Sequence, residues 1–418
     1  RIEELTERSK PVMPPSGHPL LGIGVSEWDF ALTDRVRAAI AHADEAFDKL
    51  DQAARAWLTK VGCTDLADEQ SASDIGTLSE LAELLARSPS PAPTLLSGRD
   101  AKALRERLGN AIKLGLERDQ LRNTLGERYQ PEFLSIEHLP HLDAAKRATD
   151  QISLIRFFRA RSVRGKLRVY ARDKVPALPK LITDLEQAIQ AKRLQEELAG
   201  MSDLAAALGT AWNNASPDWD ALTAMLEWAN SFSAQLTKLS NQTALCKQLI
   251  DTACDASATV ERECKAFVLA HGEWKETWSA SAQTLATDDE RAFGPDVPGW
   301  LMRVARVLNR WPAGLDDLNN WCVYNRARDA AKQVGLIDLV DKFESGDLQQ
   351  EQLGPAFESN HARRWFMAVA NSVEAIRTFN AELQESQIER FRSLDKDVIS
   401  MTKAVVAGKL AELSPSAT

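Results

Sequence analysis

Residues 32–61 run LTDRVRAAIAHADEAFDKLDQAARAWLTKV, and this stretch decides the class of fold. Its apolar side chains recur at steps of three or four residues, which places them on one face of a helix. They are Leu32, Val36, Ile40, Ala43, Phe47, Leu50, Ala54, Trp57 and Val61. We expect the helix to be capped at Ser26 and to end at Gly62, a length of about ten turns. A helix of that length with a near-heptad stripe is expected to pack against another long helix.

The rest of the chain predicts further helices and no sheet. Ala, Leu, Glu, Arg and Gln dominate, whereas the strand-favouring Val, Ile and Tyr are scarce. Helices are expected near residues 77–87, 100–129, 143–173, 178–199, 218–238, 240–285, 300–310, 315–334, 350–375 and 381–413. The sequence therefore predicts an all-α fold: an elongated multi-helix bundle with long antiparallel, coiled-coil-like helices and no significant sheet.

The organisation along the chain suggests four consecutive regions. Residues 1–25 are rich in Pro and Gly and predict an extended leading segment. They are followed by an N-terminal long-helix region (26–175), a central helical region (176–290) and a C-terminal helical region (291–418). The 418 residues begin at Arg1 without a Met, so we expect a piece cut from a longer protein.

Composition and charge exclude several classes of protein. The net charge of −9 argues against a protein dedicated to coating nucleic acid. Five cysteines with no zinc-site spacing fit a reducing cytoplasm: Cys63, Cys246, Cys254, Cys264 and Cys322. No stretch approaches the roughly 20 apolar residues that span a bilayer. We therefore expect a cytoplasmic protein without membrane contact.

No pattern in the chain predicts a catalytic site. The phosphate-binding loop GxxxxGK[ST], a GxGxxG after a strand and the zinc motif HExxH are all missing. His138 and His141 are separated by Pro140, which is expected to break a helix and to leave both histidines in a loop. We expect no catalytic residue, no metal and no cofactor in the chain itself.

The stretch from residue 156 to residue 174 is the strongest functional signal. It holds eight basic side chains and one acid in a chain that is acidic overall: Arg156, Arg159, Arg161, Arg164, Lys166, Arg168, Arg172 and Lys174. Such a cluster can neutralise the phosphates of a nucleic acid. It can equally be a basic helix face that pairs with acidic neighbours, with Phe157 and Phe158 in the core. The sequence leaves both interpretations open.

The tryptophans predict core anchors in preference to platforms for bases. Eight of them fall mostly on the apolar sides of expected helices: Trp28, Trp57, Trp212, Trp219, Trp228, Trp300, Trp321 and Trp365.

Three groups of short motifs carry a resemblance to a known family. They are LGTAW (208–212), DWDAL (218–222) and LEWA (226–229); LNNWC (318–322), RAR (326–328) and GL (335–336); and AFE (356–358), RWF (364–366), Phe379 and IERFRSLD (388–395). Their order resembles the long helical insertion of large bacterial superfamily-one DNA/RNA helicases, found in antiphage defence islands and in some cases ending in a Vsr-like endonuclease domain. The resemblance is best over 205–235 and 315–410.

The resemblance implies a non-catalytic accessory arm that contributes nucleic-acid contact or interdomain coupling in bacterial antiviral defence. In that family the phosphate loop precedes the insertion and the acidic, metal-holding box follows it. ATP and Mg²⁺ are therefore implied for the parent helicase only, and no catalytic residue is carried over. The implied partners are nucleic acid and the remaining helicase domains, with the oligomeric state open. The alternative is a protein–protein interaction scaffold without nucleic-acid binding. An independent enzyme would need a polar pocket with converging titratable groups.

Overall fold

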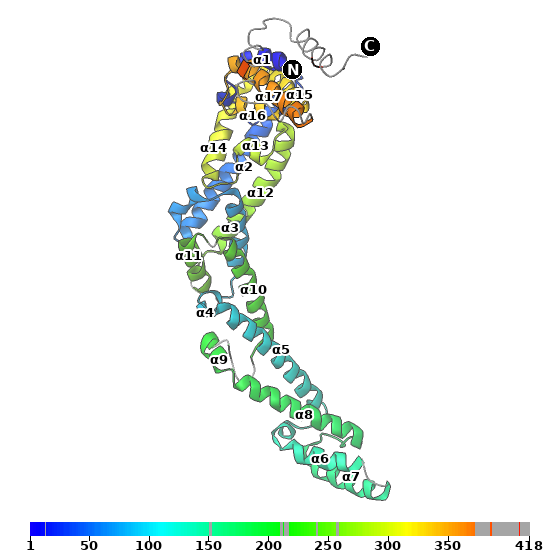
Figure 1. Cartoon of the computed structure of the whole chain (residues 1–418). Coiled ribbons are helices and arrows are strands. Elements are labelled where there is room, and N and C mark those ends of the chain that lie inside the picture. The colour runs from blue at the N-terminus through cyan, green and yellow to red at the C-terminus, as the bar shows by residue number, and fades with distance from the viewer. Residues whose placement is uncertain are drawn as a thin grey trace, which may run out of the picture. The chain divides into compact units, whose positions relative to one another are not determined.

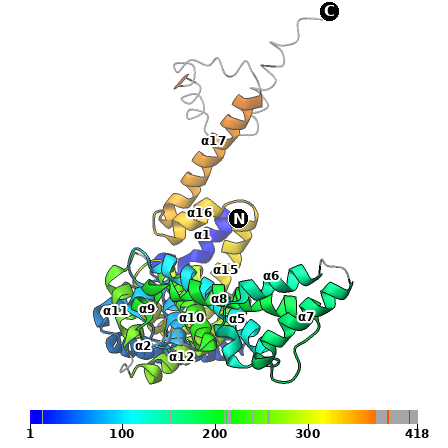
Figure 2. The same cartoon turned by 90° about the horizontal axis from the view of Figure 1, so that it is seen from below.

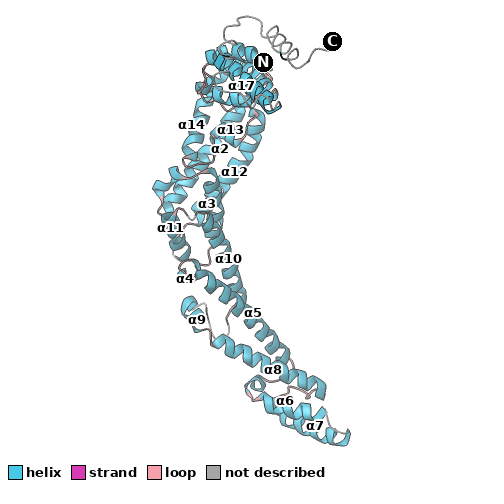
Figure 3. Ribbon diagram, viewed as in Figure 1, coloured by secondary structure: helices cyan, strands magenta, loops and turns pink. Residues whose placement is uncertain are grey.

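The computed structural model describes residues 1–12, 14–149, 153–209, 212, 217–239, 241–255, 259–372, 385–386 and 409, without the side chains of 153–156 and 370–372. The helix expected at 381–413 lies almost wholly outside these residues. The described chain forms seventeen α-helices and short 3₁₀ turns, with no strand (Figure 3). Its one β-bridge in this part joins Tyr129 to Ala171. The all-α prediction is confirmed.

The chain divides into two compact units (Figure 1). Unit 1 combines Arg1–Leu21, Ser26–Trp28 and the chain from Asp316 onward, and unit 2 comprises Gly22–Val25 and Asp29–Leu315. Unit 2 is thus inserted, in chain order, between two parts of unit 1. The four regions predicted from the sequence are consecutive stretches, whereas these units group residues that lie close together in space. The four regions therefore stay a prediction.

Unit 1 joins the N-terminal residues to the helices that follow residue 316. Its helices are α1 (Ile2–Ser9), α15 (Leu318–Gln333), α16 (Ile337–Glu344) and α17 (Leu353–Ser372). Helix α1 packs against α15 and α17, and α16 packs against α15. The extended leading segment is wrong for residues 2–9, because Leu5 is fully buried on a helical face. His18 stacks on Trp321 with ring centroids 4.5 Å apart, and its Nε2 lies 3.1 Å from Asp317 Oδ2.

Unit 2 follows an out-and-back path. Its helices are α2 (Leu32–Lys60), α3 (Ala72–Leu85), α4 (Pro93–Leu96), α5 (Ala101–Gly126), α6 (His138–Thr149), α7 (Ser153–Leu167), α8 (Leu178–Ala199), α9 (Ser202–Leu208), α10 (Trp219–Lys238), α11 (Thr243–Cys254), α12 (Glu261–Leu285), α13 (Asp289–Phe293) and α14 (Trp300–Arg310). The outgoing helices α2, α3 and α5 pack against the returning helices α12, α10 and α8, and the path turns back through α6 and α7. Helices from the first half of unit 2 therefore pack against helices from its second half along the length of the unit.

The apolar residues of the predicted stripe are buried on α2, which packs against α12. Trp57 donates from Nε1 to Cys264 Sγ at 3.2 Å, and near the other end Ser281 Oγ donates to the Ala39 carbonyl at 3.0 Å. These pairings run in opposite directions along the two helices, so the helices are antiparallel. Their coiled-coil character stays a prediction. The cap expected at Ser26 is wrong: α2 begins at Leu32 with Ala31 as its N-cap residue, and the Asp29 carboxylate just before it accepts the Ala31 N–H at 2.8 Å.

Helix α5 is held by two returning helices. Arg118 donates to Gln195 on α8 at 2.7 Å, and Arg105 donates to Asn230 on α10 at 3.0 Å. Closest approach to α10 occurs at Gly115, where an added Cβ would lie 2.1 Å from the Trp219 ring. A glycine in this helix is thus required by packing and not by backbone conformation.

Two helices expected to be continuous are each divided. The stretch 143–173 forms two helices that pack against each other, α6, which ends at Thr149, and α7, which begins at Ser153. The stretch 240–285 forms α11, which contacts α4, and α12, which contacts α2. Because α11 and α12 pack against different helices, they form two separate helices and not one continuous helix. None of the described helices is both long and apolar enough to cross a membrane.

Candidate nucleic-acid interface

The basic stretch lies at the turning point of unit 2, on α7 and the segment that follows it (Figure 2). Seven of the eight predicted cations have described side chains, and all seven are exposed: Arg159, Arg161, Arg164, Lys166, Arg168, Arg172 and Lys174. The eighth, Arg156, lies in α7, but its side chain is outside the described part. The structure therefore places the seven on the surface.

None of these seven cations forms an ion pair within the described residues. Arg164 donates from Nη2 to the Val175 carbonyl at 2.7 Å, and Arg172 donates from Nε to the Tyr129 carbonyl at 3.2 Å. Both contacts fix the position of a guanidinium without neutralising its charge. Internal pairing with acidic neighbours, one of the two interpretations left open by the sequence, is not found there.

The local charge is opposite to that of the chain. Residues 156–174 carry seven net positive charges, whereas the whole chain carries −9, which leaves −16 for all other residues. The stretch is thus a cationic surface on an anionic protein, the arrangement that orients an approaching polyanion.

Phe157 and Phe158 lie on the surface and not in the core. Their exposed fractions are 59% and 65%, and their rings meet edge to face with centroids 5.7 Å apart. Of the two interpretations left open by the sequence, the one that placed this pair in the core is wrong, because Val163 and Leu167 on another face of the helix are the buried residues. Exposed aromatic rings beside unpaired cations are a contact feature that we did not predict from the sequence.

The cationic surface rests on a separate apolar core, here called the tip cluster. Its buried residues are Leu125, Tyr129, Phe133, Leu142, Ala145, Ala148, Val163, Leu167, Ala171, Val175, Leu178, Leu181, Leu185 and Ala188. Tyr129 and Phe133 stack at its centre, with ring centroids 4.0 Å apart. The buried face of α7 packs into this cluster, so the charged side chains on the other faces of α7 point to solvent.

A buried carboxylate on α8 holds the segment that follows α5. Asp184 on α8 is fully buried and accepts hydrogen bonds from Arg128 Nη2 at 2.9 Å and from the Tyr129 hydroxyl at 2.9 Å. Burial, and then the bond to this carboxylate, raise the pKa of Tyr129 well above its usual range. A buried charge is tolerated only when paired and hydrogen-bonded, and this one is.

The histidines expected in a loop belong to the first turn of α6. His138 is buried, and its Nε2 donates to the Phe133 carbonyl at 2.7 Å. Burial lowers the pKa of His138, and nearby Lys192 and His141 add to the shift. Pro140 does not break the helix, because a first-turn residue needs no backbone N–H partner. Within the described chain, no group of three or more His, Cys, Asp or Glu side chains could hold a metal.

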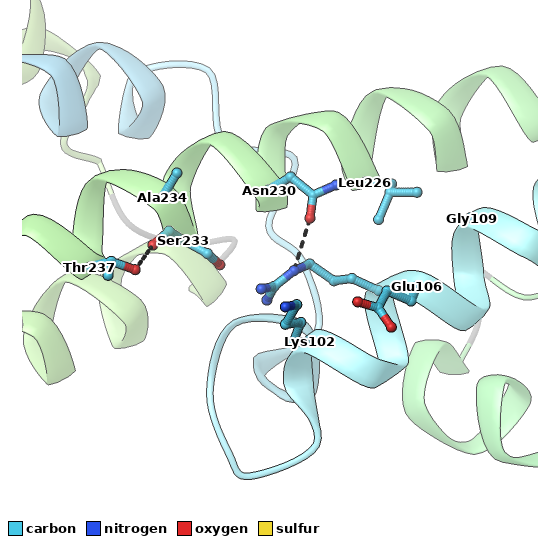
Figure 4. A pocket seen from close by; sticks show the side chains of 9 residues that line it. Lys102, Glu106, Gly109, Leu226, Asn230, Ser233, Ala234 and Thr237 are labelled. Atoms are coloured by element: carbon cyan, nitrogen blue, oxygen red, sulfur yellow. Dashed lines mark hydrogen bonds between the residues drawn. The ribbon is translucent and has the colours of Figure 1, made fainter.

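A second surface feature is a shallow polar groove between α5 and α10 (Figure 4). It is lined by Lys102, Arg105, Glu106, Gly109, Leu226, Asn230, Ser233, Ala234 and Thr237. Arg105, its most buried cation, is engaged by Asn230 and by the Leu95 carbonyl at 2.5 Å. The guanidinium of Arg105 is therefore already engaged, whereas the buried Ser233 hydroxyl in the same groove has no hydrogen-bond partner among the described residues.

Most of the tryptophans are core residues, as predicted. Trp57, Trp212, Trp219, Trp228, Trp300 and Trp321 are buried. The exceptions are Trp28 and Trp365, which are exposed by 38% and 51%.

Comparison with known proteins gave no family assignment: no protein-family model, no curated protein and no solved structure matches this chain. The helicase resemblance therefore stays a prediction from the sequence motifs. Of the segments that carry it, Thr210, Ala211, Phe379 and residues 388–395 lie outside the described chain.

Proposed function

We propose that this chain is a nucleic-acid-binding helical arm and that the cationic surface of residues 156–174 is its contact. The observation that carries the proposal is the exposure of seven cations without an ion pair among the described residues. Arg164 and Arg172 contribute to the local fold by donating to backbone carbonyls, but the seven unpaired charges repel one another, and this repulsion destabilises the compact state. A polyanion that binds across them releases counterions and gains affinity.

The path of unit 2 supports a wider role as an inserted arm. Gly24 donates to the Leu285 carbonyl at 2.9 Å, which brings the beginning of the unit beside the end of α12. The returning helices of unit 2 thus run back beside the outgoing ones, which is the path expected of an arm that leaves a base and returns to it. From this path and the sequence resemblance, we propose that the chain is an arm of an ATP-dependent superfamily-one helicase in bacterial antiviral defence. There it contributes nucleic-acid contact or interdomain coupling.

Salt-dependent binding tests the proposal. The whole chain is titrated against labelled single-stranded and double-stranded DNA and RNA at several salt concentrations. Each phosphate neutralised contributes about −0.9 to the slope of log K against log salt for a duplex and about −0.7 for a single strand. Seven contacts set an upper limit of roughly −6 and −5, respectively.

A matched pair of variants localises the contact. Arg159→Glu, Arg161→Glu and Lys166→Glu together should abolish binding. The control reverses three cations that are exposed and make no ion pair in the described structure, Arg99, Lys247 and Arg306, with the same change of net charge. It should retain binding and most of the salt slope. Equal losses in the two variants would reduce the effect to net charge, and absence of binding by the native chain at low salt would reject the proposal.

A specific observation favours a second candidate, a protein-binding scaffold. Helix α17 of unit 1 is labelled in Figure 2, and three of its consecutive side chains, Trp365, Phe366 and Met367, are exposed. Three consecutive apolar residues cover most of the circumference of a helix, so some protein surface is expected to bury them. Sedimentation velocity of the native chain and of a Trp365→Ser, Phe366→Ser variant tests for self-association through α17. An unchanged monomer in both excludes it.

A further inference from the structure

The exposed phenylalanine pair indicates which kind of nucleic acid the surface of α7 binds. We propose that the surface of α7 binds single strands, with unpaired bases stacked on Phe157 and Phe158 and the sugar–phosphate backbone held by the neighbouring cations. This inference rests on the function proposed above. It adds a role for two side chains that carry no charge and that the phosphate contacts do not need.

Helical spacing places Phe157 in one row of cations and Phe158 between that row and a second one. Arg161 and Arg164 follow Phe157 at four and seven residues and share its face of α7. Arg159 and Lys166, seven residues apart, share a face on the far side of Phe158. Phosphates bound to either row would bring the attached bases over the rings.

The row that continues from Phe158 is unobstructed. It is followed at four and seven residues by Ser162 and Gly165, both exposed, and a Cβ added to Gly165 would meet nothing within 4 Å. A small side chain and then none leave a low, uncharged track beside the rings. Flat bases need such a track, whereas an unbroken basic helix would cover it with long side chains.

A duplex would leave the phenylalanines unused. Its bases are stacked on one another, and its surface presents phosphates and the edges of the bases but not their flat faces. Stacking on an aromatic ring requires an unpaired base, and it tolerates any sequence because every base has a π face. The rings therefore favour single strands, and the cations alone would not distinguish the two.

The same helix does not fit a membrane surface. An interfacial helix buries a continuous apolar face in the lipid. The apolar face of α7 carries Val163 and Leu167, and both are buried in the tip cluster. Two phenylalanines among exposed arginines do not replace such a face.

The test measures the affinity of the whole chain for three polyanions. They are a single-stranded oligothymidylate of about 16 nucleotides, a duplex of equal length and an abasic strand with the same backbone. A Phe157→Ala, Phe158→Ala variant should bind the oligothymidylate at least about tenfold more weakly than the native chain. Its affinity for the duplex and the abasic strand should change less than about twofold, and its salt slopes should stay the same. Phe157→Trp with Phe158→Trp should restore the affinity.

The control removes two other exposed apolar side chains, Leu139 (59% exposed) and Leu269 (64%), and should bind like the native chain. Equal loss for all three polyanions, or no loss for any, would overturn the stacking role while salt-dependent binding stood. Failure of the native chain to bind any of them would reject the proposed function as well. Phenylalanine-dependent binding to phosphatidylserine vesicles without binding to oligonucleotides would replace both proposals with a lipid contact.

Discussion

Replacement of Asp184 by alanine is expected to loosen the tip cluster selectively. The carboxylate is fully buried and is the shared acceptor of Arg128 and Tyr129. Removal of one partner of a buried ion pair costs about 3–5 kcal/mol. The lower figure applies, because the Arg128 side chain is 27% exposed and can regain water. About 3 kcal/mol corresponds to a roughly 100-fold increase in local opening.

The assay uses a gap in the distribution of tryptophan. No tryptophan lies between Trp57 and Trp212, so the tip cluster does not contribute to tryptophan fluorescence. Hydrogen exchange followed by mass spectrometry should show faster exchange in peptides from α6, α7 and α8. The urea transition followed by tryptophan emission should barely move. Asp143→Ala, which removes an exposed carboxylate from α6, is the control and should change neither. Native exchange rates in the Asp184→Ala tip would refute the argument.

Three further substitutions test the packing. Gly115→Ala should destabilise the chain by about 1–2 kcal/mol in urea titrations, because the displaced Trp219 ring costs more than alanine gains in a helix; a more stable variant would contradict the close approach. His138 has a pKa held below its usual 6.5, so its contribution to stability is complete above that pH and is lost as pH falls. Exchange in the tip should therefore accelerate toward about pH 5, and His138→Leu should reduce that acceleration. In Gly24→Ala the new Cβ would lie 2.0 Å from the Ala286 carbonyl oxygen, and a loss of at least about 2 kcal/mol is expected in thermal unfolding.

The periodic helices were predictable because their signal is local. The stripe of α2 and the bounds of α8 (Leu178–Ala199) follow from apolar spacing, and spacing is a property of the sequence alone. The helix starts were less predictable. Ser26 has the right side chain for a cap, but Asp29 is the residue that accepts the backbone N–H near the start of α2. Capping depends on a competition between neighbours that composition does not resolve.

The candidate site was predicted in part. The cations of 156–174 were identified by their density, and their exposure follows from one fact absent from the sequence, which is that α7 uses Val163 and Leu167 as its buried face. The sequence left open whether Phe157 and Phe158 lie in the core, which is where phenylalanine is usually found. A local signal did exist: Arg161 and Arg164 share the face of Phe157, which is unusual for a core position. The Asp184 network had no local signal, since its partners are 55 and 56 residues away.

The pairing of early with late helices has a consequence for synthesis. Trp57 of α2 meets Cys264 of α12, 207 residues later in the chain. At about 5–20 residues per second, α2 leaves the ribosome roughly 10–40 s before that partner exists. The hairpin of α5 and α8 closes over a shorter loop and can form first, so assembly of unit 2 is expected to proceed from the tip cluster toward α2. Throughout this interval the apolar face of α2 is uncovered, and during translation this helix is the part of unit 2 that most needs a chaperone.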